Sequence, residues 1–302
     1  MSYANPSRFA VAALGALALA ACGPRAPKFV AVAEGFATPE SVRYDPELDL
    51  FFVSNINGTP SLKDNNGFIS LVTPFGRVEN LSFITGGQNF VTLDAPKGMA
   101  IKGDTLWVAD IDVLRAFNKR TGMPIASYDF ALFQATFLND VAVGPDGSLY
   151  ITDTGIRIGP GGVEHPGPDR VFRLAPDGQV SVALEGDTLG WPNGITWDAR
   201  NERFLIVSFG KPTVLAWKPG EAAPTVVATG PGGFDGIEFI DRDRALISTW
   251  ADSSLYVLAS DGTLSPYLAG LASPADIGVD TQRGRVAIPL FNPNKVEIWS
   301  AP

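Results

Sequence analysis

A short motif that recurs six times constrains the fold of this chain more than any other feature. Each copy begins an apolar run, which is followed by a turn and a second apolar run. The copies are Pro39-Glu40-Ser41-Val42, Pro96-Lys97-Gly98-Met99, Leu138-Asn139-Asp140-Val141, Pro192-Asn193-Gly194-Ile195, Phe234-Asp235-Gly236-Ile237 and Pro274-Ala275-Asp276-Ile277. Their second residues lie 40 to 57 residues apart, a spacing typical of β-propeller blades. A sandwich needs no such shared start, so the repeat predicts a six-bladed β-propeller.

The segments between the motifs are typical of strands and tight turns. Asp146-Gly147, Asp177-Gly178 and Asp261-Gly262 each separate two alternating apolar runs, as hairpin turns do. No stretch shows a sustained helical period, so we expect an all-β chain. The last predicted blade ends at Trp299 without an outer strand, and residues 29–33 can supply it. This closure would remove the free edges of an open array.

The N-terminal residues have the pattern of an export signal. Arg8 precedes a short apolar run over residues 9–21, which is followed by Cys22, the only cysteine. The run is shorter than a confident membrane span. Leu19-Ala20-Ala21-Cys22 resembles the bacterial lipobox, in which cleavage leaves the cysteine as a lipidated first residue. An ordinary signal cut after Ala20 is the alternative, and it would leave a free thiol in an oxidising compartment.

These features predict the organisation and location of the chain. We expect a lipoprotein signal peptide over residues 1–21, a tether over residues 22–28 and the propeller over residues 29–302. Gly23 is not the Asp associated with inner-membrane retention in such lipoproteins. We therefore expect a lipid-anchored protein on the periplasmic side of the bacterial outer membrane.

The second residue of each motif is a candidate for a polar site. Innermost propeller strands line the central channel, so these side chains should form a ring at one mouth. The ring consists of Glu40, Lys97, Asn139, Asn193, Asp235 and Ala275. Its four oxygen donors suit a hard cation, calcium before magnesium. A single Cys and a single His exclude a Cys-rich zinc site and a multi-histidine centre. The alternative is that these Asn and Asp side chains only cap local turns.

This outline resembles the senescence-marker-protein, gluconolactonase and regucalcin-like family of six-bladed propellers over the whole mature chain. It is more distantly similar to paraoxonases and diisopropyl fluorophosphatase. In those proteins a calcium ion at the channel mouth is held by Glu from blade one, Asn from blades three and four, and Asp from blade five. The resemblance implies the same role for Glu40, Asn139, Asn193 and Asp235, with calcium or another divalent cation as cofactor.

Lys97 departs from the pattern that the resemblance implies. Paraoxonases have at this position a His that is proposed as a base. A lysine here could pair with Glu40 or Asp235 and displace the metal. Alternatively, burial beside a divalent ion could lower its pKa, so that it acts as a base or proton donor.

Two further departures bear on the substrate and on a second ion. The gluconolactonase branch carries a substrate-binding Arg just before the blade-three Asn, where this chain has Phe137-Leu138. A less polar ester or lactone therefore fits better than a sugar acid. Paraoxonases hold a deeper calcium with acids that follow the first and third ring positions. Here these positions are Ser41 and Asp140, so a second ion is not predicted.

Two long loops return to the predicted site face, and such loops usually carry substrate contacts. The blade-one loop contains Asn57, and the blade-three loop contains Arg157 and His165. We expect these three residues to contact substrate, although a lone His in a Gly- and Pro-rich loop also fits a solvated side chain. Phe209 and Trp250 end second strands and are candidates for an apolar wall or for the core.

The sequence favours a calcium-dependent hydrolase of lactones or related esters. The ion would polarise the carbonyl, and Asp235, or Lys97 if neutral, would assist a water molecule. The alternative is a non-catalytic, lipid-anchored propeller that binds a ligand or protein partner in the cell envelope. A Lys97–Glu40 pair in an empty channel would favour this binder. The net charge of -9 and the lack of a basic cluster argue against nucleic acid.

Overall fold

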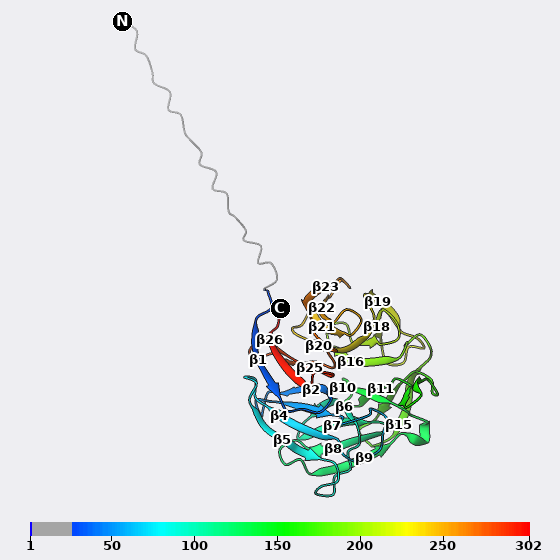
Figure 1. Cartoon of the computed structure of the whole chain (residues 1–302). Helices are drawn as coiled ribbons and strands as arrows, with labels where there is room; N and C mark the ends of the chain where they lie inside the picture. The colour runs from blue at the N-terminus through cyan, green and yellow to red at the C-terminus, as the bar shows by residue number, and fades with distance from the viewer. Residues whose placement is uncertain (2–25) are drawn as a thin grey trace.

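Six four-stranded antiparallel sheets form a closed ring in the computed structural model, which describes Met1 and residues 26–302 (Figure 1). The first strand of each sheet contacts the first strand of the next sheet around a central channel. The predicted all-β, six-bladed propeller is therefore confirmed.

Each blade runs outward from the channel, and its strands occupy four equivalent positions. The innermost strands are β2 (Pro39–Asp45), β6 (Pro96–Lys102), β10 (Leu138–Val143), β16 (Pro192–Asp198), β20 (Phe234–Phe239) and β24 (Gly278–Asp280). The second strands are β3 (Leu50–Asn55), β7 (Thr105–Asp110), β11 (Leu149–Asp153), β17 (Arg203–Ser208), β21 (Arg244–Thr249) and β25 (Arg285–Leu290).

The outer half of each blade is completed by two further strands. The third strands are β4 (Phe68–Val72), β8 (Val113–Asn118), β14 (Arg170–Leu174), β18 (Thr213–Trp217), β22 (Ser254–Ala259) and β26 (Lys295–Ser300). The outermost strands are β5 (Val78–Thr85), β9 (Pro124–Asp129), β15 (Val180–Glu185), β19 (Thr225–Thr229), β23 (Leu264–Ala269) and β1 (Phe29–Glu34). A short helix, η1 (Ala131–Phe133), and a hairpin of β12 (Arg157–Gly159) and β13 (Gly162–Glu164) lie in loops.

The N-terminal strand closes the ring, as the sequence predicts. β1 pairs antiparallel with β26, from Phe29 opposite Trp299 to Glu34 opposite Lys295. The rings of Phe29 and Trp299 meet edge to face, with centroids 5.3 Å apart. Because β1 is antiparallel to β26, Phe29 lies at the face of the propeller opposite the loop that joins β25 to β26.

A β-bulge begins five of the six innermost strands and covers the second and third motif residues. In blade one the pairing of β2 with β3 shifts between Pro39 and Val42, and blades two to five show the same shift. A bulge redirects side chains at strand ends and next to sites. The neighbouring strands also approach closely here, since a Cβ on Gly236 would lie 2.6 Å from Cα of Asp276.

Apolar side chains fill the space between neighbouring blades. Six clusters of buried residues each combine strands of two adjacent blades. The cluster that closes the ring packs Ala33 of β1 and Val296 of β26 against Val42 and Phe51 of blade one. This continuous packing fixes the six innermost strands relative to one another.

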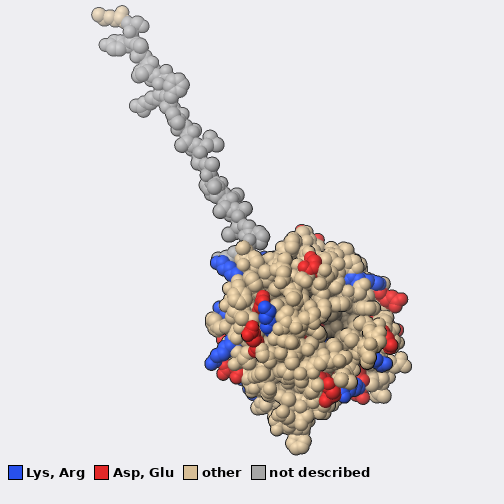
Figure 2. Space-filling model, viewed as in Figure 1, with Lys and Arg blue, Asp and Glu red and all other residues tan. Residues whose placement is uncertain are grey.

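The predicted signal peptide, apart from Met1, and Cys22 lie outside the described residues, so the lipid anchor stays a prediction. Among the residues that are described, no helix is long and apolar enough to span a bilayer. On the face shown in Figure 2, charged side chains lie mainly near the edge, and the hollowed middle is uncharged.

Candidate active site

One cavity of about 390 Å³ opens at the end of the channel where the innermost strands begin. Five members of the predicted ring line it: Glu40, Lys97, Asn139, Asn193 and Asp235. All five are buried. The sixth member, Ala275, is buried but is not part of the cavity wall. The shared motif position therefore brings the polar residues together.

Several oxygen atoms of this ring have no hydrogen-bond partner among the described residues. They are Oε2 of Glu40, Oδ1 of Asn193 and Oδ1 of Asp235. Nδ2 of Asn139 donates to Oγ1 of Thr154 over 3.0 Å, which leaves the amide oxygen of Asn139 as an acceptor. Buried, unsatisfied oxygens are costly. Two carboxylates and two amides together fit the oxygen ligands that calcium prefers.

Burial strongly perturbs the two carboxylates of the ring. The pKa of Glu40 is raised well above 4.5, first by burial and then by the nearby charges of Asp235 and Asp276. The pKa of Asp235 is raised well above 3.8, again by burial and then by Asp276. A bound cation would oppose both effects by favouring the charged forms. In the described part of the chain, no three His, Cys, Asp or Glu side chains form a metal cluster, so the two amides are essential to the fit.

Lys97 lines the cavity without pairing to a ring carboxylate. Its ammonium donates to the carbonyl oxygen of Ala95 over 3.0 Å and lies 4.2 Å from the ring centroid of Phe137. Burial lowers the pKa of Lys97 to about 8, although nearby acids, Glu40 first, oppose this shift. Of the two predicted arrangements, the one in which Lys97 neutralises Glu40 or Asp235 through an ion pair is therefore not observed.

Below the ring, a partly buried arginine occupies the channel. A guanidinium nitrogen of Arg43 lies 3.7 Å from a carboxylate oxygen of Asp140 and 3.7 Å from one of Asp276. Arg43 also pairs with Glu238. Oγ of Ser41 donates to Asp276 over 2.5 Å. The guanidinium of Arg43 thus lies between the two buried aspartates. Asp140 is the residue at which a deeper calcium was considered from the sequence.

Aromatic side chains from three blades form one wall of the cavity. We call Phe209, Trp250 and Phe291 the aromatic wall; all three line the cavity. Trp250 meets Phe209 with ring centroids 5.8 Å apart and Phe291 with centroids 5.4 Å apart, both edge to face. Phe209 and Trp250 therefore do line an apolar wall, and Phe291 extends it to blade six.

The β12–β13 hairpin covers another side of the cavity. We call residues 157–164 the flap. Ile158 and Val163 are cross-strand partners within it, and both line the cavity. The backbone N–H of Ile158 donates to Oγ of Ser61 over 3.0 Å. The flap of blade three is thereby tied to the long loop of blade one, which contributes Ile56 and Pro60 to the cavity.

Trp191 adds a second aromatic surface and is held in an unusual backbone conformation. Its φ is 61°, a region that bulky residues rarely adopt. The two carboxylate oxygens of Asp169 hold the region together. One accepts the backbone N–H of Trp191 over 2.8 Å, and the other lies 2.8 Å from Nε2 of His165. Strained residues of this kind often occur at ligand sites.

Asn57, Arg157 and His165 are not among the residues that line the cavity, so their contact with substrate stays a prediction. Asn57 donates its side-chain amide to the carbonyl of Asn66 over 2.9 Å and so closes its own loop. Arg157 is exposed at the start of the flap. His165 is bound to Asp169 and lies beside Trp191. These polar groups serve loop structure or face solvent.

The residues that sequence reasoning missed are mainly apolar neighbours of those three. They are Ile56, Pro60, Ile156, Ile158, Val163, Trp191 and Phe291. Ile56 directly precedes Asn57, and Ile156 and Ile158 flank Arg157. The available signal was therefore the position of the long loops, whose apolar members line the cavity.

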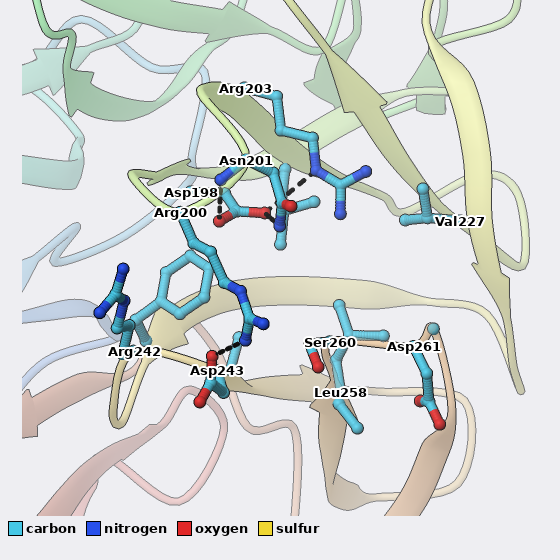
Figure 3. A pocket seen from close by; sticks show the side chains of 15 residues that line it. Asp198, Arg200, Asn201, Arg203, Val227, Arg242, Asp243, Leu258, Ser260 and Asp261 are labelled. Carbon is cyan, nitrogen blue, oxygen red and sulfur yellow. Dashed lines mark hydrogen bonds and ion pairs between the residues drawn. The ribbon is translucent and has the colours of Figure 1, made fainter.

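A second cavity, of about 210 Å³, lies between blades four and five and contains none of these residues. Four of its charged groups form two ion pairs (Figure 3): Arg200 with Asp243, and Arg203 with Asp198 over 3.0 Å. None of its side chains has a buried polar atom without a partner. It therefore lacks the unsatisfied groups that mark the channel cavity.

Comparison with known proteins gives a consistent result. A family model described as "SMP-30/Gluconolactonase/LRE-like region" matches residues 74–267. Diisopropyl-fluorophosphatase from Loligo vulgaris is 23% identical over an alignment of 266 positions that covers 78% of this chain and 79% of that protein.

Solved structures share the fold at low sequence identity. A gluconolactonase from Xanthomonas campestris superposes with a TM-score of 0.66 at 16% identity, over 92% of this chain and 96% of that one. A luciferin-regenerating enzyme superposes with a TM-score of 0.64 at 11% identity, over 89% and 94% of the two chains.

Proposed function

This chain belongs to the SMP-30/gluconolactonase/LRE-like family, and we propose that it is a calcium-dependent hydrolase of lactones or related esters. The observation that carries the proposal is the set of buried, unpartnered oxygens that Glu40, Asn193 and Asp235 present to one cavity. Together with Asn139 they would hold the ion. When bound, calcium supplies a Lewis acid for the substrate carbonyl.

The other polar groups of the cavity have separate roles in this proposal. Asp235 has a second carboxylate oxygen that can orient a water molecule towards the carbonyl. Lys97 exchanges its proton near neutral pH, because burial lowers its pKa to about 8. A lysine of this kind can accept a proton from the water or return one to the leaving alcohol.

The position of Lys97 supports the hydrolase over the non-catalytic binder. The binder would be favoured by a Lys97–Glu40 ion pair, whereas the ammonium instead bonds the carbonyl of Ala95. Both carboxylates of the ring therefore stay available for a cation.

The proposal is tested by metal content, calcium affinity and turnover on the same preparation. We expect the protein from residue 26 onwards, which contains the entire described fold, to bind calcium and to hydrolyse lactones or aryl esters only when calcium is present. Asp235→Ala should lose calcium affinity by calorimetry. Turnover that persists in chelator, or calcium affinity that Asp235→Ala leaves unchanged, would refute the mechanism.

We also propose that lipid on Cys22 anchors the protein at the periplasmic side of the outer membrane. If so, the start of β1 determines which face is near the bilayer. Phe29 lies at the face opposite the β25–β26 loop, which carries Phe291 of the cavity. The cavity mouth would then face away from the membrane. Cys22→Ser should move the protein to the soluble fraction, and unchanged membrane fractionation would contradict the anchor.

A further inference from the structure

The walls of the channel cavity differ sharply in chemistry from its polar end. The polar groups sit where the innermost strands begin, whereas the aromatic wall, Trp191 and the flap supply side chains that are apolar apart from the indole N–H groups, of which that of Trp250 is buried. Oγ1 of Thr154 is already used, because it donates to the carbonyl of Pro192 over 2.8 Å. A substrate rich in hydroxyl groups would leave those groups unpaired against such walls.

We infer that the substrate carries an apolar group beside its carbonyl, and that Ile158 and Val163 of the flap select for the length of this group. The inference rests on the proposed function, because the polar ring is what places the carbonyl. From there the apolar group extends between the aromatic wall and the flap pair. Linear or aromatic esters and alkyl-substituted lactones belong to this class, whereas polyhydroxylated sugar lactones do not.

The flap suits this role because it is fixed and apolar on its inner side. Ile158 and Val163 lie opposite each other in the hairpin, so their side chains share one face of it. The bond from Ile158 N–H to Ser61 holds that face over the cavity. Ile158 and Val163 therefore set a steric limit to the length of an apolar group in the cavity.

Binding can be tested without catalysis by using 2-alkanones from 2-butanone to 2-decanone. These ketones carry a carbonyl and an apolar chain but no hydrolysable bond. Tryptophan fluorescence, in which Trp191 and Trp250 should respond, gives the dissociation constant in buffer with chelator and with calcium. We expect affinity to rise about fourfold per methylene, or about 0.8 kcal/mol each, until the cavity is filled.

A matched pair of valine variants isolates the flap. Val163 and Val226 are exposed to 54% and 58% and both lie in strands, but only Val163 lines the cavity. Val163→Ser should weaken the longest bound ketone threefold or more and leave 2-butanone unchanged. Val226→Ser should change neither. Equal effects of the two variants, or affinity independent of chain length, would overturn the inference.

Turnover separates this inference from the proposed function. For 4-nitrophenyl esters we expect kcat/KM to rise from acetate to octanoate, and Val163→Ser to reduce the octanoate value through KM. Chain-length-dependent ketone binding without any hydrolysis would support the inference and refute the proposed function. Calcium-dependent hydrolysis that favours D-glucono-1,5-lactone over γ-decalactone would support the function and refute the inference.

Discussion

Replacing Arg43 with methionine should destabilise the propeller more than any replacement of a surface arginine. Methionine keeps much of the side-chain volume but removes the charge between Asp140 and Asp276. Both aspartates are almost fully buried, with exposed fractions of 1% and 2%. Removing one partner of a buried pair leaves an uncompensated charge and costs about 3–5 kcal/mol.

The magnitude follows from how little water reaches the cluster. Arg43 itself is 16% exposed, so solvent screening is weak. For a chain of this length, 1 kcal/mol corresponds to about 2 °C in Tm. The expected loss is therefore about 6–10 °C, measured by thermal denaturation, with urea denaturation to give the free energy of unfolding.

Arg173→Met is the matched control, because Arg173 also lies in a strand of the propeller and pairs with an aspartate. Its partner is Asp146, at 2.7 Å, and the two side chains are 35% and 41% exposed. An exposed pair of this kind contributes about 0–1 kcal/mol. If Arg43→Met costs no more than Arg173→Met, the channel cluster does not stabilise the fold in the way argued.

The pH dependence of the Arg43→Met loss gives a second check. The pKa of Asp276 is raised to about 6, mainly by burial, while Arg43 opposes this shift. The pKa of Asp140 is raised too, first by burial and then by Asp276. As the pH falls, both aspartates take up protons, and neutral carboxyls no longer need the guanidinium. The loss of stability should therefore be smaller at pH 5 than at pH 7.5, and equal losses at both would refute the reasoning.

Three further predictions concern the cavity. Because burial lowers the pKa of Lys97 to about 8, turnover should rise with pH through that value, and the rise should vanish in Lys97→Met; a rise that persists excludes the lysine. The raised pKa values of Glu40 and Asp235 mean that protons compete with calcium well above the ordinary carboxyl range, so calorimetric affinity should fall between pH 7.5 and 5.5; a flat profile would contradict this. Asp169→Ala leaves the N–H of Trp191 unpaired and should cost about 1–3 kcal/mol in urea denaturation, with weaker binding of 2-decanone; unchanged values would show that Trp191 holds its place alone.

The blade count, the closure and the polar ring could be predicted because all three follow from a repeat. A residue at a fixed motif position occupies the same place in every blade. Glu40 and Asp235 therefore had to meet at one mouth, although they lie far apart in sequence. The repeat also predicted the closing strand, since the last blade lacked an outer strand that residues 29–33 could supply.

The cavity walls could not be predicted in the same way, because they come from loops that differ between blades. The polar Asn57 and Arg157 looked functional, yet their apolar neighbours Ile56 and Ile158 line the cavity. Local backbone geometry and hydrogen bonding determine which of these loop side chains face the cavity. Asn57 has a φ of 56°, and Ile158 is held by a hydrogen bond from another blade. A positive φ is common for asparagine, whereas a hydrogen bond between two blades has no sequence pattern.

The charge of the channel ties the repeat to the proposed metal. Side chains at the second, third and fifth positions, counted from the start of each motif, lie along the channel. Their charged members are five carboxylates and two cations: Glu40, Asp140, Asp235, Glu238, Asp276, Arg43 and Lys97. Arg43 forms ion pairs with Asp140, Glu238 and Asp276. The ammonium of Lys97 donates to a backbone carbonyl. Within residues 26–302, the two carboxylates of the cavity therefore have no paired cation. Burial first, and then the neighbouring acids, raise the pKa values of Glu40 and Asp235, so protons can neutralise this excess of negative charge. A divalent ion at the ring would also neutralise this negative charge, but it would leave both carboxylates ionised. Asp235 can orient a water molecule as a hydrogen-bond acceptor only in the ionised form.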